Sequence, residues 1–92
     1  MSTKEKLLNR IQQIPKDFTF SELETLLKGL GFIKFGKGKT SGSRVVFVRK
    51  TGLGTDKLIV HKPHPQNTIK TYAIKQILEK LIDFGDIIGE EE

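Results

Sequence analysis

The segment His61-Lys62-Pro63-His64-Pro65 holds both histidines of the chain and is its densest concentration of chemically active side chains. The imidazoles stand three positions apart at the end of an expected strand, and the prolines restrict the backbone around them. An imidazole, whose ordinary pKa is about 6.5, can take a proton from a hydroxyl group near neutral pH. His61 and His64 are therefore the candidate catalytic residues, and Lys62 is a candidate for holding a phosphate.

Acid–base work on RNA suits these histidines better than metal binding does. Two imidazoles with no carboxylate closer in sequence than Asp56 fall short of a three-ligand site, and the surrounding lysines would repel a cation. In RNA cleavage an imidazole takes the proton of a 2′-hydroxyl while Arg or Lys stabilises the phosphorane, which needs no metal or other cofactor. The alternative is structural: His64 packs or caps its loop and His61 only ends a strand. Without further context this is the commoner role for two histidines.

The glycine-rich stretch from Gly36 to Ser43 is a second candidate for binding phosphates. A phosphate loop needs four residues between its glycines and a helix after it, whereas a strand is expected here, so nucleotide hydrolysis is excluded. Lys37, Lys39 and the hydroxyl of Ser43 remain suited to touching a phosphodiester backbone. The alternative is a polar connection between two strands.

Charge is distributed unevenly along the chain. Residues 1–27 are neutral overall, residues 28–75 carry a net charge of +10, and residues 76–92 carry −5. A segment as basic as the middle one attracts polyanions, of which nucleic acid is the commonest inside cells. The alternative is that the lysines serve only solubility.

Length and composition set the outer limits. The 92 residues are expected to form one domain over 1–92, because single domains typically span roughly 50 to 250 residues. The absence of cysteine excludes a disulfide framework, a thiolate metal site and a thiol nucleophile. There is no apolar run of roughly 18 to 20 residues, as a membrane span needs, and the first residues lack the apolar middle of a secretory signal. We therefore expect a cytoplasmic protein that does not enter membranes.

Helical spacing and capping residues predict three helices. Ser2 with Glu5 forms a capping box before the first helix, and Thr19 with Glu22 forms another before the second. The third helix is expected to carry Tyr72 on its apolar side. The expected helices cover residues 3–14, the segment from Thr19 to a stop at Gly31, and residues 68–84.

Alternation of apolar and polar residues predicts three strands between the second and third helices. Two amphipathic helices that flank an antiparallel meander are available to cover one face of it. The expected fold is therefore α+β with two layers: a three-stranded antiparallel sheet with helices on one face, and an extra N-terminal helix. The expected strands are Phe32 to Phe35, Arg44 to Lys50 and Lys57 to Lys62.

Pairing of the last two strands decides which side chains meet. A hairpin centred on Gly52 to Thr55 places Val46 across from His61 and Arg44 across from Pro63, so that Arg44 and His61 share a face. Which face is buried stays open, because a slip of one residue reverses the assignment. Val45, Phe47, Leu58 and Val60 point to one side, and the equally apolar Val46, Val48 and Ile59 point to the other.

These features occur in a recognisable order: Leu30-Gly31-Phe32, a basic loop ending in Gly42-Ser43-Arg44, the paired strands, the His-x-Pro-His-Pro segment and a final helix with Lys-Gln-Ile-Leu. The order resembles that of the HicA toxins over about residues 19 to 82. The resemblance implies a double-stranded-RNA-binding-like fold, a metal-independent mRNA endoribonuclease and a HicB antitoxin that masks the active site. It also divides the chain into a helical extension (1–17), a HicA-like core (18–84) and an acidic tail (85–92).

One departure from the family bears on the mechanism. The family's catalytic histidine follows Gly-Ser at the start of the second strand, and Arg44 stands there in this sequence. Arginine stays protonated at neutral pH, so it cannot act as a base, but it can hold a phosphate bidentately. Either His61 or His64 has taken the role of base, or the protein binds RNA without cutting it. The RNA-binding set is Lys37, Lys39, Ser43, Arg44 and Lys62, and a third alternative is a protein-interaction domain for an acidic partner.

Overall fold

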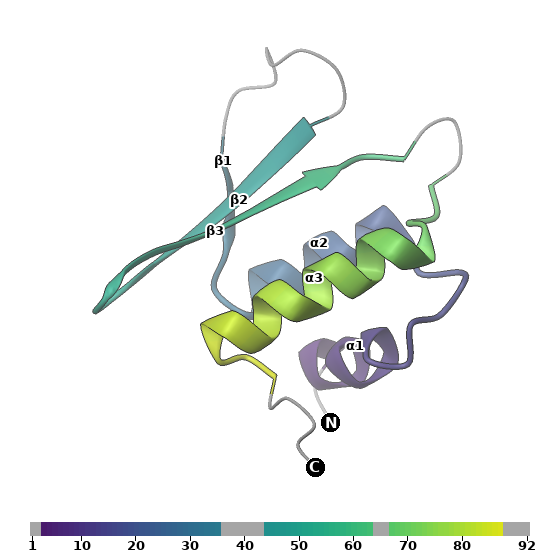
Figure 1. Cartoon of the computed structure of the whole chain (residues 1–92), viewed down its shortest axis with the longest axis horizontal. Helices are drawn as coiled ribbons and strands as arrows, with labels where there is room; N and C mark the ends of the chain where they lie inside the picture. The colour runs from purple at the N-terminus through teal and green to yellow at the C-terminus, as the bar shows by residue number, and fades with distance from the viewer. Residues whose placement is uncertain (1–2, 36–43, 64–66, 88–92) are drawn as a thin grey trace.

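In residues 3–35, 44–63 and 67–87, which the computed structural model describes, two helices are followed by three strands and a third helix. This succession confirms the predicted α+β fold. None of the helices in these ranges has the length and apolar character that crossing a membrane requires. The elements are α1 (Thr3–Ile11), α2 (Phe20–Gly29), β1 (Ile33–Phe35), β2 (Arg44–Thr51), β3 (Gly54–His61) and α3 (Thr71–Phe84) (Figure 1).

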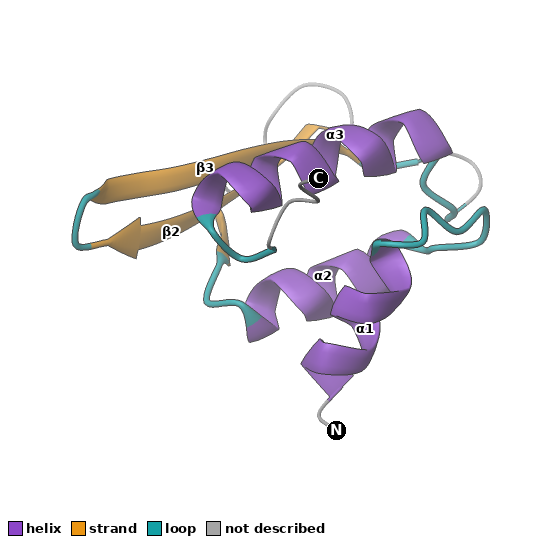
Figure 2. Ribbon diagram, turned by 60° about the horizontal axis from the view of Figure 1, so that its bottom comes forward, coloured by secondary structure: helices purple, strands orange, loops and turns teal. Residues whose placement is uncertain are grey.

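The three strands form an antiparallel sheet in the order β1-β2-β3. Helices α2 and α3 lie on the same side of it, and α1 packs on α2 farther from the strands (Figures 1 and 2). Phe47, Leu58 and Val60 point from the sheet toward α2 and α3 and are buried. Burial of these side chains makes one face the inner face and leaves the other face open. The helices and the segments beside them complete the core with Ile11, Phe18, Phe20, Leu23, Leu26, Leu27, Phe32, Ile69, Ile74, Ile77, Leu81 and Ile87.

Both ends of α2 are fixed by local hydrogen bonds. The Thr19 hydroxyl accepts from the Glu22 N–H at 3.1 Å, and the Glu22 carboxylate accepts from the Thr19 N–H at 2.9 Å, which completes the predicted capping box. At the other end Gly31 has a φ of +100°, and the Phe32 N–H donates to the Leu27 carbonyl at 2.9 Å. This is a Schellman-type ending, so the predicted stop at Gly31 is confirmed.

Replacing Gly31 with alanine is expected to lower the free energy of unfolding by about 1–2 kcal/mol, because a side chain is strained at this positive φ. The added Cβ would also stand 3.3 Å from the Cδ of Arg49. Gly52→Ala is the matched control, since a Cβ there meets nothing within 4 Å. Urea unfolding followed by circular dichroism measures both variants, and equal losses at the two positions would contradict the prediction.

Two helices are shorter than predicted. Helix α1 ends before Ile14, whose φ is +52°, because a residue that precedes a proline, here Pro15, is disfavoured in the right-handed helical region. Helix α3 begins after Thr68, which instead forms an isolated β-bridge with Thr19. That bridge holds the starts of α2 and α3 side by side.

Candidate functional site

The hairpin between β2 and β3 is tighter than the sequence predicts. Thr51 pairs with Gly54, so the loop consists of Gly52 and Leu53 alone. The Thr51 hydroxyl accepts a hydrogen bond from the Leu53 N–H at 3.1 Å and donates one to the Gly54 carbonyl at 3.2 Å. A threonine side chain therefore closes the turn and sets the register of both strands.

This register places Arg44 directly opposite His61. The predicted pairs, Val46 with His61 and Arg44 with Pro63, are wrong, because the expected loop extended too far into β3. The error in register is an even number of residues, so it does not move any side chain to the other face. Arg44 and His61 therefore share a face, as expected, and are closer neighbours than predicted.

The face that holds Arg44 and His61 is the open one, and both residues are exposed. The buried face of the hairpin, which the sequence left open, is therefore the one that holds Phe47, Leu58 and Val60. The open face also carries an apolar patch next to the pair: Ile33 is 61% exposed, Phe35 is 62% exposed and Ile59 is 46% exposed. By register, the apolar patch consists of Ile33, Phe35, Val46, Val48 and Ile59.

The two faces of the sheet differ in charge. Among the described strand residues, the charged side chains of the open face are all basic: Arg44, Lys50 and Lys57. The inner face holds ion pairs instead, such as Lys34 with Glu24 at 2.6 Å. Among the described cations of the basic segment, Lys34 and Arg49 are held in ion pairs, and Lys28 and Lys75 lie on helices.

Arg49 is the centre of the ion pairs on the inner face. Its guanidinium donates to both carboxylate oxygens of Asp86 at 2.9 Å, to Asp56 at 2.7 Å and to the Leu30 carbonyl at 2.9 Å. It also stacks 4.3 Å from the centroid of the Phe32 ring. The hydrogen bonds to Asp86 raise the pKa of the guanidinium, burial opposes the rise, and the hydrogen bond to Asp56 adds to it. Arg49 therefore connects the hairpin to the segment that follows α3. Its guanidinium is occupied by Asp56 and Asp86 and is not available to bind an external anion.

The structure brings some of the predicted site residues together. Arg44 and His61 meet across the sheet, whereas Lys62, just past β3, places its Nζ 5.9 Å from the ring centroid of Phe20 at the start of α2. Lys62 is exposed and lies beside the pair in sequence, but on the helix side of the strand end. The predicted residues Lys37, Lys39, Ser43 and His64 lie outside the described residues.

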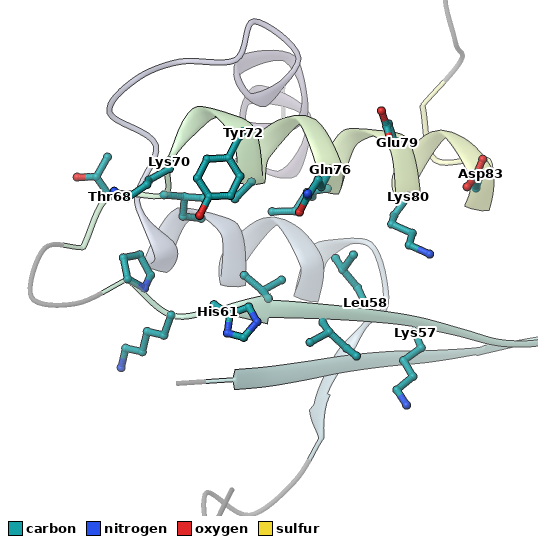
Figure 3. Close-up of a pocket in the computed structure, with 17 residues that line it drawn as sticks. Lys57, Leu58, His61, Thr68, Lys70, Tyr72, Gln76, Glu79, Lys80 and Asp83 are labelled. Carbon is teal, nitrogen blue, oxygen red and sulfur yellow. The ribbon is translucent and has the colours of Figure 1, made fainter. Parts of the chain in front are cut away.

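A groove of about 860 Å³ runs along β3 on the side that faces α3, and His61 lines it (Figure 3). Tyr72 and Gln76 line the opposite wall from α3. Tyr72 is 64% exposed, so its predicted place on the apolar side of the helix is wrong. The buried positions of α3 are Ile74, Ile77 and Leu81. The sequence carries no separate signal for the groove, because its walls come from elements that meet only in the fold.

A scan against protein families matches residues 20–81 to the HicA toxin of bacterial toxin-antitoxin systems. The chain belongs to the HicA toxin family. Comparisons with curated proteins and with solved structures give no match. The matched segment runs from the start of α2 to the last turns of α3, and α1 precedes it. Both Arg44 and His61 lie inside the match.

The cross-strand pair of Arg44 and His61 can be compared with the position of the catalytic histidine in the HicA family. Arg44 occupies the position at which the resemblance places the family's catalytic histidine. In this chain the imidazole of His61 stands at the directly opposed position, on β3 instead of β2. The pair therefore offers an imidazole and a guanidinium within one small area of the open face.

Proposed function

We propose that this HicA toxin cleaves mRNA in the cytoplasm by acid–base catalysis, with His61 as the base and Arg44 holding the phosphate. The observation that carries the proposal is the direct pairing of these two exposed residues. Directly opposed residues of antiparallel strands have Cβ atoms about 4.5–5.5 Å apart. Side chains so close can act on the same phosphodiester.

The chemistry needs only these side chains and the RNA itself. The 2′-oxygen of the substrate bonds to phosphorus as its proton passes to the His61 imidazole. The bond from phosphorus to the 5′-oxygen of the next nucleotide then breaks, and that oxygen takes a proton from solvent. Arg44 binds the non-bridging oxygens bidentately and stabilises the charge that builds on them. The products are a 2′,3′-cyclic phosphate and a free 5′-hydroxyl.

The electrostatics of the open face support an RNA target. Lys50 and Lys57 lie on the same face as Arg44, with no carboxylate among the described strand residues of that face. Phosphates are attracted to such a surface and release counterions when they bind it. We infer that the strand of RNA lies across the open face and places one phosphate at the pair.

Cleavage of an mRNA transcript by the intact chain in the presence of a chelator tests the proposal. We expect fragments that end in a 2′,3′-cyclic phosphate, and an affinity for RNA that falls as salt rises. Binding without fragments would leave an RNA-binding protein that no longer cuts, a role that Arg44 in the histidine position also fits. An affinity for RNA that is absent or insensitive to salt would favour a protein-interaction domain instead.

We also propose that a HicB-like antitoxin covers the apolar patch. Exposed patches of this kind mark protein interfaces, and the basic residues around this one favour a partner with an apolar centre and an acidic rim. Ile33 and Phe35 are more than half exposed although they lie in a sheet. Because the patch adjoins Arg44 and His61, a protein bound there would block the pair.

Replacing Phe35 with serine is expected to weaken binding of the antitoxin by about tenfold or more, because aromatic side chains at the centre of an interface contribute most of its affinity. Leu53→Ser is the matched control, since Leu53 is fully exposed at the tip of the hairpin and lies outside the apolar patch. Calorimetry with a purified HicB-like antitoxin measures the affinity of both variants. Equal affinities of the two variants would place the interface elsewhere.

A further inference from the structure

We propose that the groove between β3 and α3 binds one nucleotide of the RNA beside the cleaved phosphate, with its base stacked on Tyr72 and its edge facing Gln76. The inference rests on the proposed function and deepens it, because it assigns a site that selects the base. His61 connects the two sites, since it belongs to the cross-strand pair and also lines the groove.

Tyr72 has the exposure and position of a stacking residue. Its side chain is 64% exposed and does not belong to the buried row of α3. Tyr72 projects from the first turn of α3 into the groove, and His61 lies on β3, which forms the opposite wall (Figure 3). Stacking of a base on an aromatic ring strengthens binding by about tenfold to hundredfold and accepts any base.

Gln76 supplies the group that can distinguish one base from another. It follows Tyr72 by four positions, so both side chains project from the same face of the helix, and both line the groove (Figure 3). Its exposed amide offers a donor and an acceptor, which is what recognition of a base edge requires.

The charges along the groove restrict where RNA enters it. Lys62 and Lys70 lie at the end that holds Tyr72, with no carboxylate among the lining residues there. Toward the other end of α3, the acidic Glu79 and Asp83 lie beside Lys57 and Lys80. Figure 3 shows Lys70 beside Tyr72, and Glu79 and Asp83 farther along the helix. The positive charge of the first end is therefore uncompensated, whereas the charges of the second end balance. A phosphate is therefore attracted most strongly to the His61 end, which favours binding of a nucleotide there.

The alternative occupant is an extended peptide added to the edge of β3. Such a peptide inserts alternate side chains into apolar pockets. At the His61 end the groove presents an imidazole, a phenol, an amide and two ammonium groups beside the apolar Pro63, Ile69 and Ala73. This mixture favours a nucleotide, because the apolar residues can contact a base while the polar and charged groups bind its edge and its phosphate.

Intrinsic fluorescence gives a direct test, because Tyr72 is the only tyrosine and the chain has no tryptophan. The intact protein is titrated with 2′-O-methyl tetranucleotides of adenine, guanine, cytosine or uracil, which bind without being cleaved. We expect saturable quenching of the tyrosine signal by at least one of the four. Absence of quenching by all four would overturn the inference.

Variants separate stacking from folding. We expect Tyr72→Ala to weaken binding of the quenching tetranucleotide by about tenfold to hundredfold, measured by anisotropy of a labelled tetranucleotide, and Tyr72→Phe to retain it within about twofold. Lys75→Ala is the control, since Lys75 is exposed on α3 and does not line the groove. Gln76→Ala is expected to reduce the differences among the four bases. Equal affinities of the alanine and phenylalanine variants at position 72 would contradict stacking.

The test also distinguishes this inference from the proposed function. Quenching without any cleavage of RNA would support the nucleotide site and count against His61 as a base. Cleavage without quenching would support the proposed function and remove the groove from the recognition of RNA.

Discussion

Replacing His61 with alanine is expected to lower the rate of RNA cleavage by about 10²- to 10⁴-fold, the usual contribution of a positioned general base. The loss should appear with the chelator present and with RNA affinity nearly unchanged, because the removed imidazole moves a proton and the cations still hold the phosphates. Lys75→Ala is the control and should change the rate little, because Lys75 is exposed on α3 and lies outside both the open face and the groove.

An exchange of the pair tests its geometry further. The double variant Arg44→His with His61→Arg moves the imidazole to the position that the HicA resemblance assigns to the catalytic histidine, and places the guanidinium opposite. We expect it to cleave faster than His61→Ala, because directly opposed residues keep both groups on one face. Full activity of His61→Ala together with loss of activity in His64→Ala would assign the base to His64 instead.

The sequence predicts those parts of the site that depend on local or alternating patterns. The capping box at Thr19 and the stop at Gly31 were predictable because their hydrogen bonds join residues close in sequence. The common face of Arg44 and His61 was predictable because side chains alternate strictly along a strand. Neither argument needs knowledge of a distant contact.

Other parts depend on contacts between distant segments. The bridge between Thr19 and Thr68 displaces the start of α3. Arg49 binds Asp86, which follows the end of α3 and is 37 residues away in sequence. The choice of buried face depends on which apolar row α2 and α3 cover, since both rows of the hairpin are apolar. Tyr72 falls within a helical apolar pattern and is exposed because the groove lies beside it.

Replacing Arg49 with alanine is expected to lower the free energy of unfolding by about 3 kcal/mol, the largest loss that we expect from a polar residue of this fold. The side chain is only 16% exposed, and its removal leaves the carboxylates of Asp56 and Asp86 without their common partner. It also removes the guanidinium that stacks on Phe32. Arg49→Lys keeps the charge but cannot bind two carboxylates as a fork, so we expect an intermediate loss.

Arg44 provides the control for this prediction on the same strand. It is an exposed arginine of the open face, so Arg44→Ala should change the free energy of unfolding by less than about 0.5 kcal/mol while weakening RNA binding. Arg49→Ala should lower the free energy of unfolding but leave the affinity for RNA nearly unchanged under conditions in which the variant remains folded, because its guanidinium faces the core. Urea unfolding measures the free energy of unfolding of each variant, and RNA titration measures its affinity for RNA. Equal stability losses in the two variants would mean that the ion pairs of Arg49 do not hold the hairpin to α3. Equal losses of RNA affinity would mean that RNA binding is not confined to the open face of the sheet.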